Sequence, residues 1–84
     1  MIAAEAIRHI VRSSGLSMRE ASSRMGMTPN YISSVVRQAE RMDADLVSST
    51  LARAAEACGY VLAFVPEGEL PEGAVAIDAK GEEA

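Results

Sequence analysis

The sequence lacks most of the residues from which catalytic and metal sites are built. Its 84 residues include one cysteine, one histidine and no tryptophan. One cysteine cannot form a disulfide within the chain, and with a single histidine it is too little for a metal-ligand cluster. There is no glycine-rich phosphate loop and no carboxylate pair placed in a pocket, so we expect neither an enzyme nor a bound cofactor or metal ion. We expect Cys58 to lie in the core, with a reactive thiol as the alternative.

Long apolar runs are also missing, although hydrophobic residues make up 49% of the chain. No stretch of about eighteen apolar residues could span a membrane, and the first residues do not have the pattern of a signal peptide. We therefore expect a cytoplasmic protein of one small domain. A chain of this length buries only about 60% of the surface that it exposes when unfolded, so dimerisation would add stability.

Acidic residues outnumber basic ones, and the net charge of −4 argues against a nucleic-acid partner, because phosphate binding normally requires a basic surface. The two signs are unevenly distributed, however. From Arg8 to Arg41 there are six arginines against two glutamates, a balance of +4, whereas from Pro66 onward there are six acids against one lysine, a balance of −5. Binding depends on the local field at the contact surface, so the first half of the chain is still suited to phosphate.

Two helix starts lie on either side of a short turn between residues 17 and 38. Ser17 and Glu20 have the spacing of a capping box, and Gly26 can close the helix that follows. Thr28 is then a candidate N-cap, followed by Pro29 at the first helical position. The pattern predicts a helix from about 17 to 25, a tight turn, and a second helix over 28–38.

The second of these helices has two different faces. Ile32, Val35 and Val36 recur at helical spacing and predict a buried face. The opposite face carries hydrogen-bonding side chains and no carboxylate: Asn30, Tyr31, Ser33, Ser34 and Arg37. Such a face is suited to lie beside base edges and phosphates.

Helical periodicity also predicts a first helix over 2–14 and a last helix from the N-cap candidate Asp45 to Cys58, with Asp43 as the alternative cap. A polar connection over 39–44 precedes this last helix. After Gly59 the pattern changes to two short apolar runs, 60–65 and 74–77, which predict a β-hairpin with a long loop. We expect this hairpin to pair with its copy in a homodimer, through Tyr60, Val61, Leu62, Phe64, Val65, Val75 and Ile77. The alternative is a hairpin folded back on its own helices. Residues 79–84 are acidic, and we expect them to be disordered.

The ordered set formed by Ala21-Ser22, Gly26, Ile32, Val35 and Arg37 resembles the Cro/cI-like (Xre-type) helix-turn-helix regulators of bacteria and phages, over residues 3–58. Ser22 departs from the family pattern, which usually has alanine there. The resemblance implies a mainly α, lambda-repressor-like four-helix domain over 1–59. After Gly59 the chain departs from the commonest family plan, which continues with a fifth helix, and the residue pattern predicts instead the hairpin as a dimerisation element over 60–78. The resemblance also implies dimeric binding to operator DNA, with helix 28–38 in the major groove.

Carried over by position, the resemblance implies two sets of DNA contacts. Residues at or near base edges are Pro29, Asn30, Tyr31, Ser33 and Ser34, with packing across the helix as the alternative for Tyr31. Residues at phosphates are Ser17, Met18, Thr28, Arg37 and Arg41, where the alternative for the two arginines is surface charge that complements the helix dipole. The expected function is a sequence-specific transcriptional regulator, most simply a repressor, associated with double-stranded DNA in the cytoplasm. The alternative is an antitoxin or adaptor whose hairpin and acidic tail bind a protein partner such as a toxin.

Overall fold

The computed structural model describes residues 1–42 and 44–78, and these form four helices with no β-strand. The helices are α1 (Ala3–Ser13), α2 (Met18–Arg24), α3 (Tyr31–Met42) and α4 (Ser48–Ala57). The predicted mainly α class is therefore confirmed for the described part of the chain. The predicted disordered tail, 79–84, lies outside the described residues.

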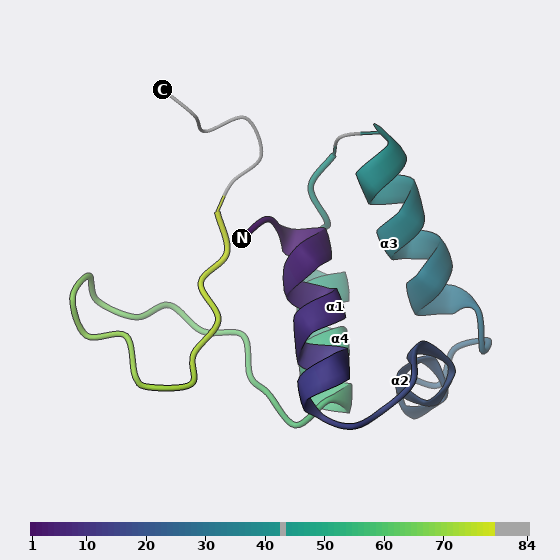
Figure 1. Ribbon diagram of the computed structural model, residues 1–84, viewed down its shortest axis with the longest axis horizontal. Helices are drawn as coiled ribbons and strands as arrows, with labels where there is room; N and C mark the ends of the chain where they lie inside the picture. The colour runs from purple at the N-terminus through teal and green to yellow at the C-terminus, as the bar shows by residue number, and fades with distance from the viewer. Residues whose placement is uncertain (43, 79–84) are drawn as a thin grey trace.

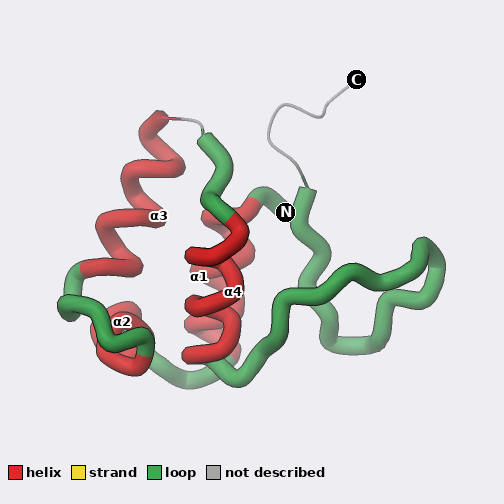
Figure 2. Tube along the Cα trace, turned by 180° about the vertical axis from the view of Figure 1, so that it is seen from behind, coloured by secondary structure: helices red, strands yellow, loops and turns green. Residues whose placement is uncertain are grey.

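The helices pack around one small core (Figure 1). The α1 and α4 helices lie against each other and run in the same direction, while α3 runs in the opposite direction. Short α2 packs on both α3 and α4, and it is seen nearly end-on in Figures 1 and 2, so that it crosses α3 steeply. This arrangement presents α2 and α3 together at one side of the molecule.

Small side chains at the centre of the core allow the helices to approach closely. Ala21 of α2, Val36 of α3 and Ala54 of α4 are fully buried, and Ile7 of α1 is 2% exposed. Cys58 belongs to the same cluster, so its predicted place in the core is confirmed. Burial raises the pKa of the Cys58 thiol, which keeps it neutral and poorly nucleophilic.

The boundaries of α3 differ from the predicted ones at both ends. Its first residue is Tyr31, because Thr28 and Pro29 form a turn in which the Tyr31 N–H donates to the Thr28 carbonyl at 3.0 Å. Proline is favoured at the second position of such a turn as well as at the start of a helix. At the other end α3 continues to Met42, through residues predicted as a connection, because Ala39 is buried against the core.

The last helix also begins later than predicted. Its N-cap position is Val47, which has no side-chain capping bond, and the first helical residue is Ser48. The predicted cap, Asp45, precedes the helix by three residues, and the alternative cap, Asp43, lies outside the described residues. The end at Cys58 agrees with the prediction, with Gly59 at a φ of +83° and the Tyr60 N–H donating to the Ala55 carbonyl at 2.8 Å.

The predicted β-hairpin is not formed in the described chain. Residues 60–78 contain no strand, and no backbone hydrogen bond joins the two apolar runs 60–65 and 74–77. Two tight turns occupy the loop instead: Glu69 N–H donates to the Pro66 carbonyl and Ala74 N–H to the Pro71 carbonyl. A two-stranded ribbon alone is marginal in water, and one that is apolar on both faces needs cover that a single copy of this small domain does not supply.

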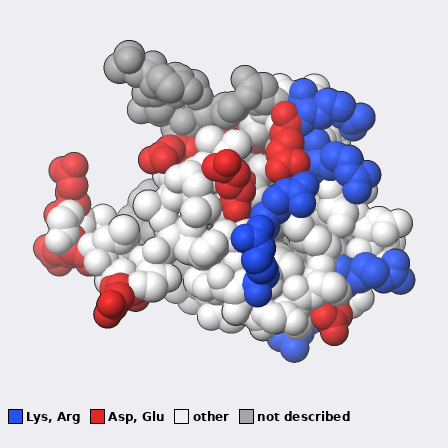
Figure 3. Space-filling view, viewed as in Figure 1, with Lys and Arg blue, Asp and Glu red and all other residues white. Residues whose placement is uncertain are grey.

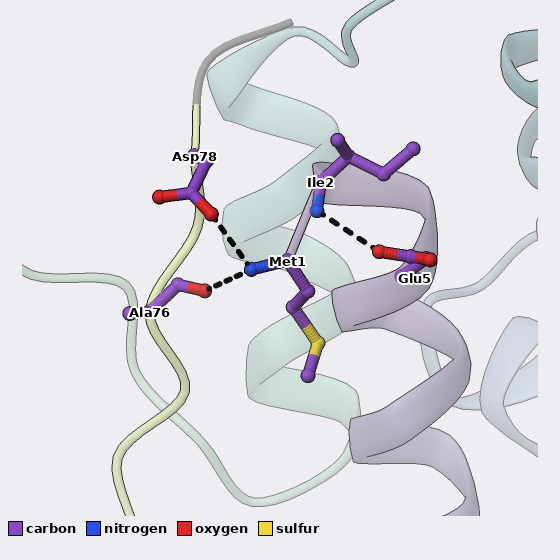
Figure 4. A network of polar contacts seen from close by, with 5 residues as sticks. All are labelled: Met1, Ile2, Glu5, Ala76 and Asp78. Atoms are coloured by element: carbon purple, nitrogen blue, oxygen red, sulfur yellow. Dashed lines mark hydrogen bonds and ion pairs between the residues drawn. The ribbon is translucent and has the colours of Figure 1, made fainter. Parts of the chain in front are cut away.

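The end of this segment pairs with the start of the chain (Figure 4). The Met1 nitrogen donates to the Ala76 carbonyl at 3.2 Å and to the Asp78 carboxylate at 3.0 Å, and the Asp78 N–H donates to the Met1 carbonyl at 2.8 Å. Between these ends the segment loops away from the helices (Figure 1). None of the helices described is both long and apolar enough to cross a membrane.

Candidate nucleic-acid interface

The turn between α2 and α3 is fixed by a glycine in the left-handed conformation. Gly26 has a φ of +76°, its N–H donates to the Ser23 carbonyl at 2.9 Å, and the Met27 N–H donates to the Ser22 carbonyl at 3.0 Å. These two bonds are those of a Schellman motif, which satisfies the last carbonyls of a helix while reversing the chain. The predicted role of Gly26 in ending the first helix of the pair is therefore confirmed.

The start of α2 carries the predicted capping box. The Glu20 N–H donates to Ser17 Oγ at 3.0 Å, and the Ser17 N–H donates to Glu20 Oε1 at 2.8 Å. The bond from the Ser17 backbone is the main reason why the pKa of Glu20 is lowered. A phosphate oxygen at the Ser17 N–H would thus compete with an ionised carboxylate. The predicted phosphate contacts of Ser17, which is exposed, and Met18, which is half-buried, remain predictions.

The predicted base-reading residues lie at the start of α3 and in the turn before it. Pro29 and Asn30 are exposed in this turn together with Thr28, and Ser34 is exposed one turn further on. Tyr31 and Ser33 are half-buried, and Tyr31 packs partly on the core. The structure therefore brings Thr28, Pro29, Asn30 and Ser34 onto one accessible surface, whereas Tyr31 and Ser33 are only partly accessible.

The second half of α3 carries both predicted phosphate-contacting arginines. Arg37 and Arg41 are exposed. Glu40 lies between them in sequence, but Arg8 of α1 engages it through Nε to Oε2 at 2.8 Å and Nη2 to Oε1 at 2.9 Å. These two bonds from Arg8 lower the pKa of Glu40, so the carboxylate stays ionised. The positive charge of Arg8 balances the negative charge of Glu40, which is the one carboxylate of α3. Sequence reasoning missed this pair, because the two residues are separated by 32 positions.

Arginine side chains are gathered on one side of the molecule. Figure 3 shows them over the side occupied by the helices, with some acidic side chains among them, while further acidic side chains project at the opposite end, where Figure 1 places the C-terminal loop. A shallow hollow of about 380 Å³ beside α2 adds Arg19 and Arg24 to this side, next to Pro29. All arginines of the described residues therefore lie on the helices, whereas the segment 60–78 carries acidic side chains and no basic one.

Ser22 has a role that the sequence did not reveal. It is fully buried, and its Oγ accepts a hydrogen bond at 3.0 Å from the N–H of Ile32 in α3. From the sequence, Ser22 was only a departure from the family pattern, which usually has alanine there. A separate question is metal binding: among the described residues, no group of three or more His, Cys, Asp or Glu side chains could hold a metal ion.

Comparison of the chain with protein-family models, with curated proteins and with solved structures found no significant match.

Proposed function

We propose that the protein is a sequence-specific DNA-binding regulator of transcription, which inserts the start of α3 into the major groove. The observation that carries this proposal is the surface formed by Thr28, Pro29, Asn30 and Ser34. These residues are exposed together at the end of a helix that crosses α2 after a Schellman turn. Exposed amide and hydroxyl groups at the N-terminal end of a second helix are what direct reading of base edges requires.

Charge on the same side supports the proposal. Arg37 and Arg41 continue along α3 beyond the reading residues, and Glu40 is neutralised by Arg8. The acidic loop 66–72 lies at the opposite end of the molecule, away from α3 (Figure 1). DNA approaching α3 would thus meet arginines first, and phosphate contacts of this kind position a protein without reading sequence.

Repression of transcription is the simplest consequence of such binding, since a small protein bound to DNA blocks access to its site.

The protein acts as a homodimer in this proposal, through the C-terminal segment. Val61 is 80% exposed and Phe64 is 106% exposed, and Leu62, Val65 and Ile77 are exposed as well. An apolar hollow of about 360 Å³ lies between this segment and the helices α1 and α4. A second copy would cover these side chains and provide partners for the backbone groups of 61–65, so that the hairpin or an equivalent pairing forms across the dimer.

Two substitutions test the assignment of roles. Asn30→Ala removes a group that can bond adenine at two atoms, so we expect it to relax the preference at one base pair by about 1–3 kcal/mol. Arg37→Ala removes a phosphate contact, so it should weaken binding to selected and random DNA alike and reduce the salt dependence. Titration of both DNAs at two salt concentrations measures each effect. Equal losses on selected and random DNA for both variants would contradict the assignment.

The exposed apolar segment also favours a second candidate function, an antitoxin or adaptor that binds another protein. Its apolar runs flank an acidic loop containing Glu67, Glu69 and Glu72. Such a segment can become ordered when it binds a partner protein. Purification of the protein from its native cell separates the candidates, because a stoichiometric second polypeptide is expected only for the adaptor.

A further inference from the structure

Ser22 joins α2 to α3 through a hydroxyl group with no exposure to solvent. It is the buried polar side chain of the described core. Its Oγ donates to the Met18 carbonyl, one turn earlier in α2, at 2.8 Å and accepts from the Ile32 N–H at 3.0 Å. The hydroxyl proton is thus held by α2, which leaves an oxygen lone pair directed at the first turn of α3.

The first turn of α3 depends on this oxygen. The first four N–H groups of a helix have no partner within the helix. Here the Tyr31 N–H donates to the Thr28 carbonyl and the Ser34 N–H to the Asn30 carbonyl. The Ile32 N–H is buried and has the Ser22 oxygen as its acceptor. A side chain of α2 therefore caps α3, whereas a helix is usually capped by the residue just before it.

Two residues suited to capping precede α3 and do not cap it. Threonine and asparagine are both common N-caps. In the described part of the chain, however, the side chains of Thr28 and Asn30 are exposed and make no hydrogen bond. These are also residues that we expect to contact DNA. The amide of Asn30 could not read a base while it accepted a bond from its own helix.

We propose that Ser22 is a positioning residue for recognition: by capping α3 from within the core, it keeps the side chains of Thr28 and Asn30 available to DNA. This inference rests on the proposed function. With alanine at position 22, the Ile32 N–H loses its acceptor and Asn30 becomes the nearest replacement cap. Its amide is then withdrawn from the DNA surface. The consequence is a loss of sequence preference with little loss of general affinity, because the arginines of α3 are unchanged.

The capping role is tested first without DNA, by hydrogen exchange of single amides. In the unaltered protein the Ile32 amide should exchange more slowly than the Ser33 amide, for which the described residues supply no acceptor. Ser22→Ala should speed exchange of the Ile32 amide by about tenfold, the effect of losing one such bond. Ser23→Ala, on the exposed side of α2, is the control and should change nothing. Equally fast exchange of Ile32 and Ser33 in the unaltered protein would overturn the capping role, even if Ser22→Ala failed to fold.

Recruitment of Asn30 is tested by combining substitutions. Asn30→Ala should leave the stability of the unaltered protein nearly unchanged, since its side chain makes no bond there, but it should destabilise the Ser22→Ala protein further. Additive effects of the two substitutions would contradict recruitment of Asn30 as a replacement cap.

Binding to selected and random DNA completes the test. Ser22→Ala should lower the ratio of the two affinities by about fivefold or more, while affinity for random DNA stays within about twofold. Ser23→Ala should preserve both. An unchanged ratio would overturn the positioning role. No preference by the unaltered protein would contradict the proposed function itself, whereas the exchange of the Ile32 amide would still decide whether Ser22 caps α3.

Discussion

Glu40 is acidic yet lies on the helix that we expect to face DNA, and its pairing with Arg8 explains how this is tolerated. The Arg8 side chain is 42% exposed and the Glu40 side chain 36%, and two parallel hydrogen bonds join them. Two parallel bonds between a guanidinium and a carboxylate form one of the stronger side-chain contacts in proteins. The pair joins α1 to α3 and balances the negative charge on the side that we propose to face DNA.

The stability of the protein should accordingly depend on Glu40 at acid pH. The bond from Arg8 lowers the pKa of Glu40 below its ordinary value of 4.5. A carboxylate with a lowered pKa stabilises the folded state above the unfolded pKa, and this contribution is lost as the pH falls through the folded value. Glu40→Gln should therefore reduce the loss of stability on going from about pH 5 to about pH 3.

Urea unfolding across this pH range measures the effect, with Glu56→Gln as the control. Glu56 is an exposed carboxylate of α4 for which the described residues show no ion pair. If Glu40→Gln and the unaltered protein lose stability in parallel below pH 5, the pair contributes nothing to folding.

At the scale of elements, the turn that joins α2 to α3 sets the direction of the surface that we propose to contact DNA. Gly26 occupies a conformation with φ of +76°, and a Cβ placed there would meet nothing within 4 Å. The cost of a side chain at this position is therefore one of backbone conformation and not of packing.

Gly26→Ala should destabilise the protein by about 1–2 kcal/mol, the cost of the left-handed conformation for an ordinary residue. Gly26→Asn should cost less, because asparagine tolerates this conformation better. Denaturation midpoints of the two variants give the comparison. A larger loss for asparagine than for alanine would show that packing, and not φ, governs the position.

The elements also show what the sequence could and could not predict. Four helices, the capping box at Ser17 and the glycine turn at Gly26 follow from local patterns, and the structure confirms them. The start of α3 was predicted three residues too early, since Thr28 and Pro29 suit a turn as well as a helix start. The Arg8–Glu40 pair and the cap from Ser22 could not be predicted, because both depend on contacts between helices. The predicted hairpin is not formed in the single chain, since the apolar pattern of residues 60–65 and 74–77 does not say what will cover them.

At the scale of the whole molecule, a helical domain with arginines on one side is joined to an apolar segment that stays uncovered. Phe64, Val61 and Leu70 are exposed there, at 106%, 80% and 55%. Burial of such side chains is worth about 1.5–3 kcal/mol each in favourable cases. A small domain with a limited core has the most to gain from covering them with a second copy.

Phe64→Asp should therefore dissociate the proposed dimer without unfolding the helices, because the Phe64 side chain is fully exposed in the single chain. Sedimentation equilibrium measures the change in mass, and circular dichroism reports the helices. Val47→Asp is the matched control, since Val47 is an exposed apolar residue at the other end of α4. A monomeric unaltered protein, or equal effects of both substitutions, would contradict a dimer through the C-terminal segment.

Selection of bound sequences from a random pool of double-stranded DNA, at near-physiological salt, tests the central claim most directly. A dimer that reads DNA with α3 should enrich an inverted repeat with a fixed spacing between its halves, since each copy places one α3 in the major groove. The Asn30→Ala protein should enrich the same repeat with one position relaxed. If the unaltered protein enriches no sequence and binds only weakly, with affinity that disappears as salt rises, then it does not act by reading DNA.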